Sequence, residues 1–321
     1  MKKLNYEVLK ESGYTGYVLK DAPEKVLQFG EGNFMRAFVD YFIDVMNEKA
    51  GFNGKVVLVQ PIRNVEGGFC LNDRINEQEG LYTLFLRGFQ DGKKVNDKRV
   101  ISSVSRCLNA YEDYAEVMKC AENPELRFIM CNTTEAGIRY DAGCKFTDKP
   151  GDTYPAKLTQ FLYHRFEKFG KEEGKGFIIL SCELIDDNGK ELEKCVLKYA
   201  EQWELGEEFT AWIKKENVFC STLVDRIVTG YPRSEAASIY EELGYEDNVL
   251  DTGEIFGFWV IEGPQSIKDE FPVDKAGLPI LITDNHKPYK QRKSTYSEWC
   301  PYFFCTWRIS CRKRYCKRLY E

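Results

Sequence analysis

The feature that most constrains the fold is a strand, a glycine turn, a helix and a second strand that follow one another within residues 25–60. Residues 25–29 (KVLQF) predict a short strand, residues 30–32 (GEG) a tight turn, and residues 33–49 a helix. Apolar side chains recur on one face of that helix at helical spacing: Phe34, Phe38, Phe42 and Val45. Residues 55–60 (KVVLVQ) contain a continuous apolar run, which is typical of a buried strand in a parallel sheet.

Strands and helices continue to alternate along the chain. The patterns predict strands over 126–131 and 177–182, and helices over 111–122, 156–169, 189–203, 207–216 and 233–243. This order indicates an α/β fold, with a Rossmann-like, mostly parallel sheet and flanking helices, followed by the start of a truncated helical carboxy-terminal domain. We expect a nucleotide-binding domain over residues 1–240, the start of a substrate domain over 241–293, and an aberrant tail over 294–321.

The glycine turn lies where a dinucleotide fold places its phosphate loop. Glycines there let the backbone approach a pyrophosphate, and the following helix offers unpaired N–H groups at its amino-terminal end. Two features depart from the usual pattern, since Met35 stands at the third glycine position and the second strand ends in Gln60 rather than an acidic residue. A tight connection without a nucleotide is therefore the alternative, but the strand–helix–strand context favours a cofactor site. The predicted cofactor-binding residues are Val26, Leu27, Gln28, Phe29, Gly30, Glu31, Gly32, Asn33, Phe34, Met35, Arg36 and Ala37.

Composition excludes several other classes of protein. The formal net charge of the whole chain is −6, and the excess of acidic residues argues against nonspecific nucleic-acid binding. No stretch approaches the roughly 18–20 apolar residues that a membrane span requires. The cysteines before residue 294 occur singly within apolar runs, which favours reduced thiols in the cytoplasm, and neither they nor the two histidines have metal-ligand spacing. The sequence thus predicts a cytoplasmic protein without a zinc site, acting on a small molecule.

Five segments, in order, carry a resemblance to a known family. They are QFGEGNFMRAFVDYFIDVMNEKAGFNGKVVLVQP from Gln28, CNTTEAGI at 131–138, SCELIDDNG at 181–189, FCSTLVDRIVTGYP at 219–232 and ITDNHKPYKQRK at 282–293. Together they resemble the mannitol dehydrogenase family, the polyol-specific long-chain dehydrogenases, over residues 20–293. The G-x-G-x-x-x-R-A pattern of that family falls on Gly30, Gly32, Arg36 and Ala37, whereas Thr229 stands where a Pro or Ser is usual.

The resemblance implies a zinc-independent, NAD-linked hydride transfer between a ketose-type carbonyl and a secondary alcohol. Within the family the chain is most similar to members that reduce tagaturonate to altronate, so a sugar acid is the expected substrate; fructuronate or mannitol is the alternative. The family pattern implies Lys293 as the acid–base group, assisted by Asn188 and Asp225. Without the resemblance, each has a simpler interpretation: a turn at Asn188-Gly189, a structural ion pair at Asp225-Arg226 and a solvated basic face around Lys293. A noncatalytic NAD-binding protein is the alternative from another functional class.

The last 28 residues differ from the rest of the chain. They carry a net charge of +4, whereas residues 1–293 carry −10, and they follow neither helical nor strand periodicity. A suitable choice of codons for Ser294 onward, shifted by one nucleotide, encodes VRILNGAH, which restores the K-x4-N-x2-H motif after Lys293. Both tail tryptophans, Trp299 and Trp307, yield the required glycines because Trp has a single codon. We therefore expect that the tail is an out-of-frame translation and that this chain is inactive or nearly so, rather than carrying a metal-binding or nucleic-acid-binding tail.

Overall fold

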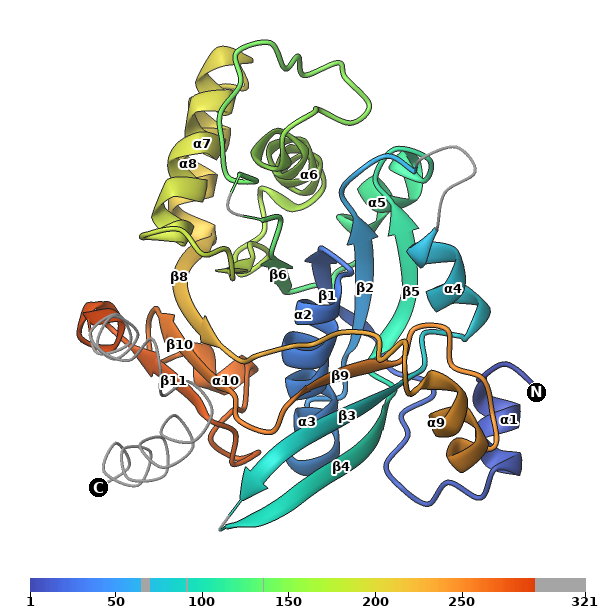
Figure 1. Cartoon of the computed structure of the whole chain (residues 1–321). Coiled ribbons are helices and arrows are strands. Elements are labelled where there is room, and N and C mark those ends of the chain that lie inside the picture. Colours follow the sequence, from blue (N-terminus) through green and yellow to red (C-terminus); the bar gives the residue numbers. More distant parts are fainter. Residues whose placement is uncertain (65–69, 91, 135, 292–321) are drawn as a thin grey trace.

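The main sheet of the molecule is a doubly wound, mostly parallel sheet (Figure 1). A computed structural model describes residues 1–64, 70–90, 92–134 and 136–291. Within these residues eight strands pair in the order β11-β10-β8-β7-β6-β1-β2-β5. Neighbouring strands are parallel except for β8 and β10, which are antiparallel. The strands are β1 (Glu24–Phe29), β2 (Lys55–Gln60), β5 (Val104–Asn109), β6 (Phe128–Cys131), β7 (Ile178–Ser181), β8 (Val218–Asp225), β10 (Phe258–Glu262) and β11 (Ile280–Thr283).

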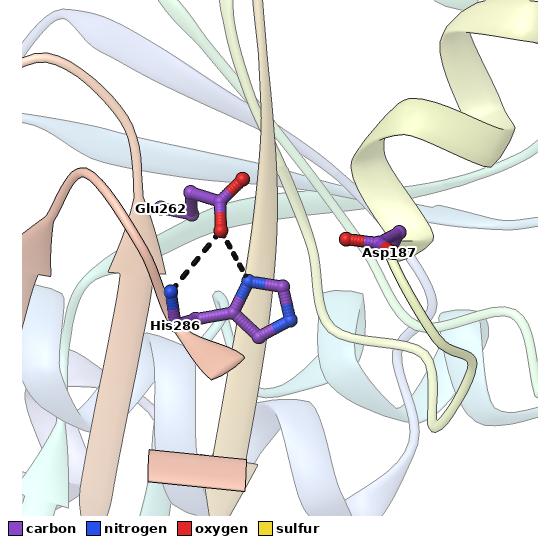
Figure 2. Close-up of side chains that lie close together, drawn as sticks. All are labelled: Asp187, Glu262 and His286. Carbon is purple, nitrogen blue, oxygen red and sulfur yellow. Dashed lines mark hydrogen bonds and ion pairs between the residues drawn. The ribbon is translucent and has the colours of Figure 1, made fainter. Parts of the chain in front are cut away.

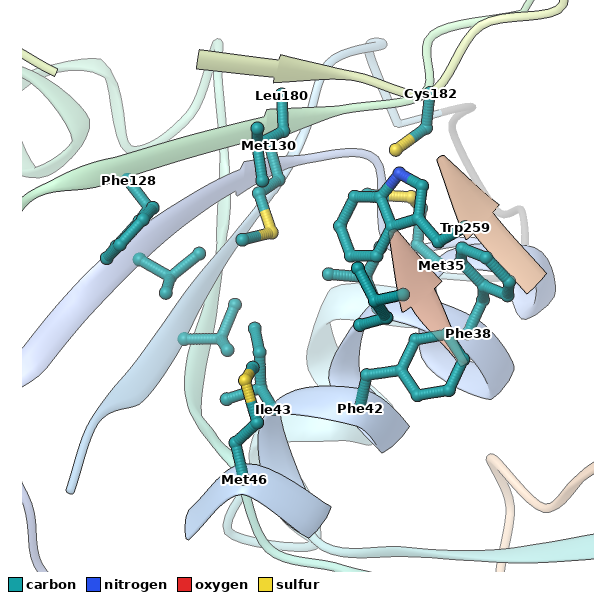
Figure 3. Close-up of a cluster of buried hydrophobic side chains, with 14 of the residues drawn as sticks. Met35, Phe38, Phe42, Ile43, Met46, Phe128, Met130, Leu180, Cys182 and Trp259 are labelled. Carbon is teal, nitrogen blue, oxygen red and sulfur yellow. The ribbon is translucent and has the colours of Figure 1, made fainter. Parts of the chain in front are cut away.

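The predicted glycine turn and helix connect β1 to β2. The helix runs without interruption through α2 (Asn33–Met35), a π-helical turn η1 (Arg36–Asp40) and α3 (Tyr41–Ala50). It ends at Gly51, whose φ of 65° lies in the left-handed region that favours glycine at a helix end. Its apolar face packs on one side of the sheet in a cluster where Phe38, Phe42 and Trp259 of β10 are in ring contact (Figure 3).

Other helices cover the opposite face of the sheet. These are α5 (Tyr114–Cys120), α6 (Tyr154–Phe169), α7 (Asn188–Gln202) and α8 (Glu207–Glu216). Their apolar residues form a second core with alternate residues of β1, β2, β6 and β7. Burial on both faces explains why these strands are almost continuously apolar in the sequence.

A smaller sheet packs beside the first. It contains β4 (Lys93–Ile101), β3 (Tyr82–Gln90) and β9 (Asp251–Glu254), with β3 and β4 antiparallel and β3 and β9 parallel. The remaining helices of the described residues are α1 (Tyr6–Glu11), α4 (Leu71–Glu77), α9 (Ala236–Leu243) and α10 (Ile267–Glu270). Residues of α1, α9, β3 and β4 share a separate small core.

The predicted Rossmann-like, mostly parallel sheet with flanking helices is confirmed, and each strand and helix predicted from periodicity is present with shifts of a few residues at its ends. The sequence did not predict the β3–β4 hairpin or the strands β5, β8, β9, β10 and β11. The domain boundary at residue 240 stays a prediction, although β10 and β11 from beyond it extend the main sheet. The cysteines of the described residues are free thiols, and no helix there is long and apolar enough to cross a bilayer.

Candidate active site at the carboxyl edge of the sheet

A cavity of about 650 Å³ opens where the order of the strands changes direction. From β1 the chain continues to β2 and β5 on one side, and then crosses to β6, β7 and β8 on the other. Ligands of doubly wound folds bind at the carboxyl ends of the strands next to such a switch point. The cavity is lined by residues at the carboxyl ends of β6, β7 and β8 and by one residue of α2: Phe34, Asn132, Thr134, Ala136, Leu184, Val224, Asp225 and Arg226.

The glycine turn lies next to this cavity, because Phe34, two residues after Gly32, lines it and Gly30 closely approaches Asn132, which also lines it. Gly30 has a φ of 113°, and a β-carbon there would lie 2.9 Å from the carbonyl oxygen of Asn132, so the turn and the loop after β6 approach closely only because residue 30 is glycine. Gly32 is exposed, and a β-carbon there would meet nothing within 4 Å. The helix that begins at Asn33 directs the free N–H groups of its first turn to this open space. The turn therefore fits a phosphate group.

The predicted cofactor segment divides into supporting residues and residues that a ligand can reach. Five apolar members are buried in the cores: Val26, Leu27, Phe29, Met35 and Ala37. The buried amide of Gln28 donates to the carbonyl of Gly30 at 3.1 Å. The buried Arg36 donates to the carbonyl of Glu31 at 3.1 Å and to Oδ1 of Asn33 at 2.6 Å. These buried side chains support the turn from the protein interior. Residues 30–34 lie on the side of the segment that a dinucleotide can reach.

Asp225, one of the three predicted catalytic residues, lies at the end of β8 and lines the cavity. It is therefore placed to meet a ligand that enters beside Phe34. Lys293, the predicted acid–base residue, lies outside the described residues, as does the tail from 294 to 321 for which we predicted an out-of-frame origin.

Asn188 does not line the cavity. Its side chain is 1 % exposed, and its amide nitrogen donates to the carbonyls of Ser181, Glu183 and Thr222 at 2.9, 2.8 and 3.1 Å. Its Oδ1 accepts from the backbone N–H groups of Thr222 and Gly189, each at 2.9 Å. In this geometry Asn188 ties β8 to the loop that follows β7, and the donor function that the family pattern implies would require it to release one of these bonds.

The loops after β6 and β7 are joined by a buried carboxylate that the sequence did not single out. Glu183 is 2 % exposed and accepts from the backbone N–H and the hydroxyl of Thr133, both at 3.0 Å. Burial raises the pKa of Glu183, and the bonds from Thr133 partly offset that rise. Asn132 and Thr134 line the cavity on either side of this clamp. The sequence could have identified Asn132 and Thr134 by their position directly after the buried strand 126–131. In this fold the ends of strands carry ligand-binding side chains.

A charged network lies beside the start of α7 (Figure 2). Glu262 accepts from Nδ1 of the buried His286 at 2.6 Å and from Nζ of Lys190 at 2.6 Å. Lys190 also lies 3.4 Å from Asp187. Burial alone would raise the pKa of Glu262, but the bonds from Lys190 and His286 outweigh it and lower the value to about 2.

Asp187, Glu262 and His286 place possible metal ligands within 4.8 Å of one another. The Lys190 ammonium lies 2.6 Å from Glu262 and 3.4 Å from Asp187, and a separation of 2.6 Å between Glu262 and His286 is that of a hydrogen bond. We therefore interpret the cluster as an ion-pair network. This network anchors the segment that follows β11. A further ion pair, between Lys290 and Asp186, holds the same segment against the loop after β7.

Comparison with known proteins identifies the family of this chain. A family model described as the mannitol dehydrogenase Rossmann domain matches residues 24–275. The chain is 52% identical over 272 residues to altronate oxidoreductase of Escherichia coli O7:K1, covering 84% of this chain and 55% of the relative. Altronate oxidoreductase of Shigella flexneri gives the same values. The chain thus spans about half the length of the curated relatives it matches.

Solved structures show the same fold. Mannitol 2-dehydrogenase of Pseudomonas fluorescens, in ternary complex with NAD and D-mannitol, superposes with a TM-score of 0.70 at 23% identity, covering 91% of this chain and 60% of the other. A substrate-free D-sorbitol dehydrogenase gives a TM-score of 0.70 at 21% identity, with coverages of 90% and 60%. The family match over most of the sequence, together with the doubly wound sheet and its glycine turn, establishes that this chain belongs to the mannitol dehydrogenase family and carries its Rossmann domain.

Proposed function

We propose that this chain binds NAD(H) at the turn of residues 30–32 and the first residues of the helix that follows, and that the cavity beside them is where a chain with its reading frame restored transfers hydride between that cofactor and a sugar-derived substrate. The observation that carries this proposal is that Phe34, directly after the glycine turn, lines a cavity at the switch point of the sheet, where Gly30 also approaches Asn132. The exposed backbone at Gly32 suits the pyrophosphate, and Phe34 offers an apolar surface at the inner end.

The proposed reaction is the reduction of tagaturonate to altronate. Its support is the 52% identity to the altronate oxidoreductases, whose reaction we transfer to this chain as a proposal. Fructuronate and the mannitol–fructose pair are the competing substrates within the family.

The residues would share the work as follows. Bound NADH supplies the hydride that reaches the keto carbon. Lys293 is the proposed donor of the proton that converts the resulting alkoxide to the alcohol, and Asp225 would hold a substrate hydroxyl or the ammonium in place. Asn188 would position the wall of the cavity from behind, through its bonds to Ser181, Glu183 and Thr222.

The test is a comparison of binding and turnover. NADH binding is measured by fluorescence titration, and NADH oxidation is followed with tagaturonate, fructuronate and fructose, both for this chain and for a version in which the reading frame after codon 293 is restored. We expect both chains to bind NADH and only the restored chain to oxidise it rapidly, with tagaturonate preferred. Equal turnover by both chains would contradict the out-of-frame interpretation, and binding without turnover by both would favour a noncatalytic NAD-binding protein.

A further inference from the structure

The helix over residues 33–50, called the cofactor helix below, contains a π-helical turn. The carbonyl groups of this turn accept hydrogen bonds from donors outside the helix. The hydroxyl of Tyr82 donates to the carbonyl of Arg36 at 2.8 Å, and the hydroxyl of Ser103 donates to that of Asp40 at 2.8 Å. Between them, Nη1 of Arg226 donates to the carbonyl of Ala37 at 2.5 Å. A π turn widens the helix and disturbs the regular bonding of its carbonyl groups, so donors from neighbouring elements can stabilise it. The geometry of this turn therefore depends on tertiary contacts.

Arg226 is held firmly at this position. Its side chain is 8 % exposed, and Nε donates to the carbonyl of Phe256 at 3.0 Å. The guanidinium lies 4.9 Å from the ring centre of Tyr41, and a β-carbon at Gly257 would lie 2.5 Å from its Nη2 atom. Burial lowers the pKa of Arg226 to about 10, so the side chain still carries its charge at neutral pH. It therefore forms a rigid link between the end of β8 and the cofactor helix.

The segment that follows β8 also approaches the start of the cofactor helix at Gly230, four residues after Arg226. Gly230 has a φ of 76°, and a β-carbon there would lie 2.4 Å from Nδ2 of Asn33 and 3.2 Å from its Cγ. Oδ1 of Asn33 in turn accepts from Arg36 at 2.6 Å. The side chain of Asn33, the first residue of the helix, therefore lies between Gly230 and Arg36, next to the turn at Gly32.

We propose that Arg226 and Gly230 are positioning residues that fix the glycine turn of residues 30–32 relative to Asp225. The inference rests on the proposed function. Arg226 follows Asp225 directly in the sequence and contacts the cofactor helix at Ala37. Gly230 contacts the same helix at its first residue, Asn33. Because one short segment holds both the helix and the carboxylate, loss of either contact shifts the N–H groups that receive the phosphates. NADH affinity then falls, although the proposed phosphate contacts are made by the turn itself.

The first experiment compares Gly230→Ala with Gly244→Ala. Both glycines adopt nearly the same left-handed conformation, with φ values of 76° and 79°, so the backbone strain of an added β-carbon is matched. Only at Gly230 does the β-carbon meet another side chain, since a β-carbon at Gly244 would meet nothing within 4 Å. We expect similar losses in Tm but at least a tenfold rise in the Kd for NADH in Gly230→Ala alone. Equal Kd values in the two folded variants would overturn the role of Gly230.

The second experiment compares two buried arginines that both donate to backbone carbonyls. Arg226→Met removes the bond to Ala37, whereas Arg165→Met removes bonds to Ala121, Asn123 and Leu126 behind the opposite face of the sheet. We expect both variants to lose stability, and only Arg226→Met to raise the Kd for NADH about tenfold or more, with partial recovery in Arg226→Lys. An unchanged Kd in folded Arg226→Met would overturn the role of Arg226. Failure of the parent chain to bind NADH would instead contradict the proposed function, and the parent titration shows this separately.

Discussion

Asp40 makes a contribution to the pH dependence of the stability of this protein that a single substitution should remove. Its side chain lies in the π-helical turn, is fully buried, and has one carboxyl oxygen without a hydrogen-bond partner among the described residues. Burial raises the pKa of Asp40 to about 8, although the Arg36 charge and the hydroxyl of Tyr82 oppose that rise. At neutral pH the folded protein therefore holds a proton on Asp40.

The sign and size of the effect follow from proton linkage. An Asp in the unfolded chain has a pKa of about 3.9, so between about pH 4 and pH 8 the folded state binds one proton that the unfolded state lacks. The free energy of unfolding then falls by about 1.4 kcal/mol for each unit of rising pH, or about 2.7 kcal/mol between pH 5 and pH 7. Above about pH 8 both states are ionised, and this contribution becomes constant.

Asp40→Asn keeps the shape of the side chain and removes its ionisation. We expect the stability of the variant relative to the parent to increase with pH by about 1.4 kcal/mol per unit between pH 5 and pH 7. Urea unfolding of both proteins at half-unit steps measures this difference directly. Other buried acids with raised pKa values, such as Asp251 and Asp247, are present in both proteins and largely cancel. Parallel stability curves would refute the reasoning, because they would mean that Asp40 is ionised in the folded state.

Three further substitutions test the site. Gly30→Ala forces a β-carbon to 2.9 Å from the carbonyl of Asn132 at a φ of 113°, so we expect it to abolish NADH binding in titrations; retained affinity would show that the turn adapts. Asn188→Ala removes the hydrogen-bond partner of three buried carbonyls and two backbone N–H groups. We expect the free energy of unfolding in urea to fall by about 3 kcal/mol, and a loss under 1 kcal/mol would contradict the role of Asn188 in joining β8 to the loop after β7. In Glu262→Gln the charge that holds His286 and Lys190 is lost. Since the depressed pKa of Glu262 supplies stability above about pH 4 that disappears toward pH 2, we expect this variant to show a shallower acid loss than the parent, and identical acid transitions would be inconsistent with the network.

Much of the fold could be predicted because its signals are local. The apolar run at 55–60, the helical spacing of Phe34, Phe38 and Phe42, and the glycines at 30 and 32 each act over a few residues, and each element formed as expected. The strands that were missed depend on distant partners. β10 pairs with β8 from about 35 residues away, and β9 pairs with β3 across more than 160 residues, so neither shows a periodic pattern that identifies its neighbour.

The candidate site shows the same division. The sequence predicted the turn at residues 30–32 and named Asp225, which lines the cavity, because glycine conformations and family motifs lie within short segments. It did not distinguish Arg36, whose guanidinium is buried beneath the turn, from the residues that face a ligand. Nor did it show that the amide of Asn188 bonds to backbone groups on two strands, since those groups carry no sequence signal.

The amino-acid sequence by itself determined the β-α-β unit, the glycine turn and the family to which the chain belongs. Tertiary structure alone decided which residues support that turn and which ones line the cavity. The reason is that a side chain such as Arg226 acquires its role from the carbonyl of Ala37, which is 189 residues away in the chain and becomes its neighbour only when β8 packs against the cofactor helix. Local periodicity encodes elements, whereas burial and hydrogen-bond partners arise from the way those elements pack.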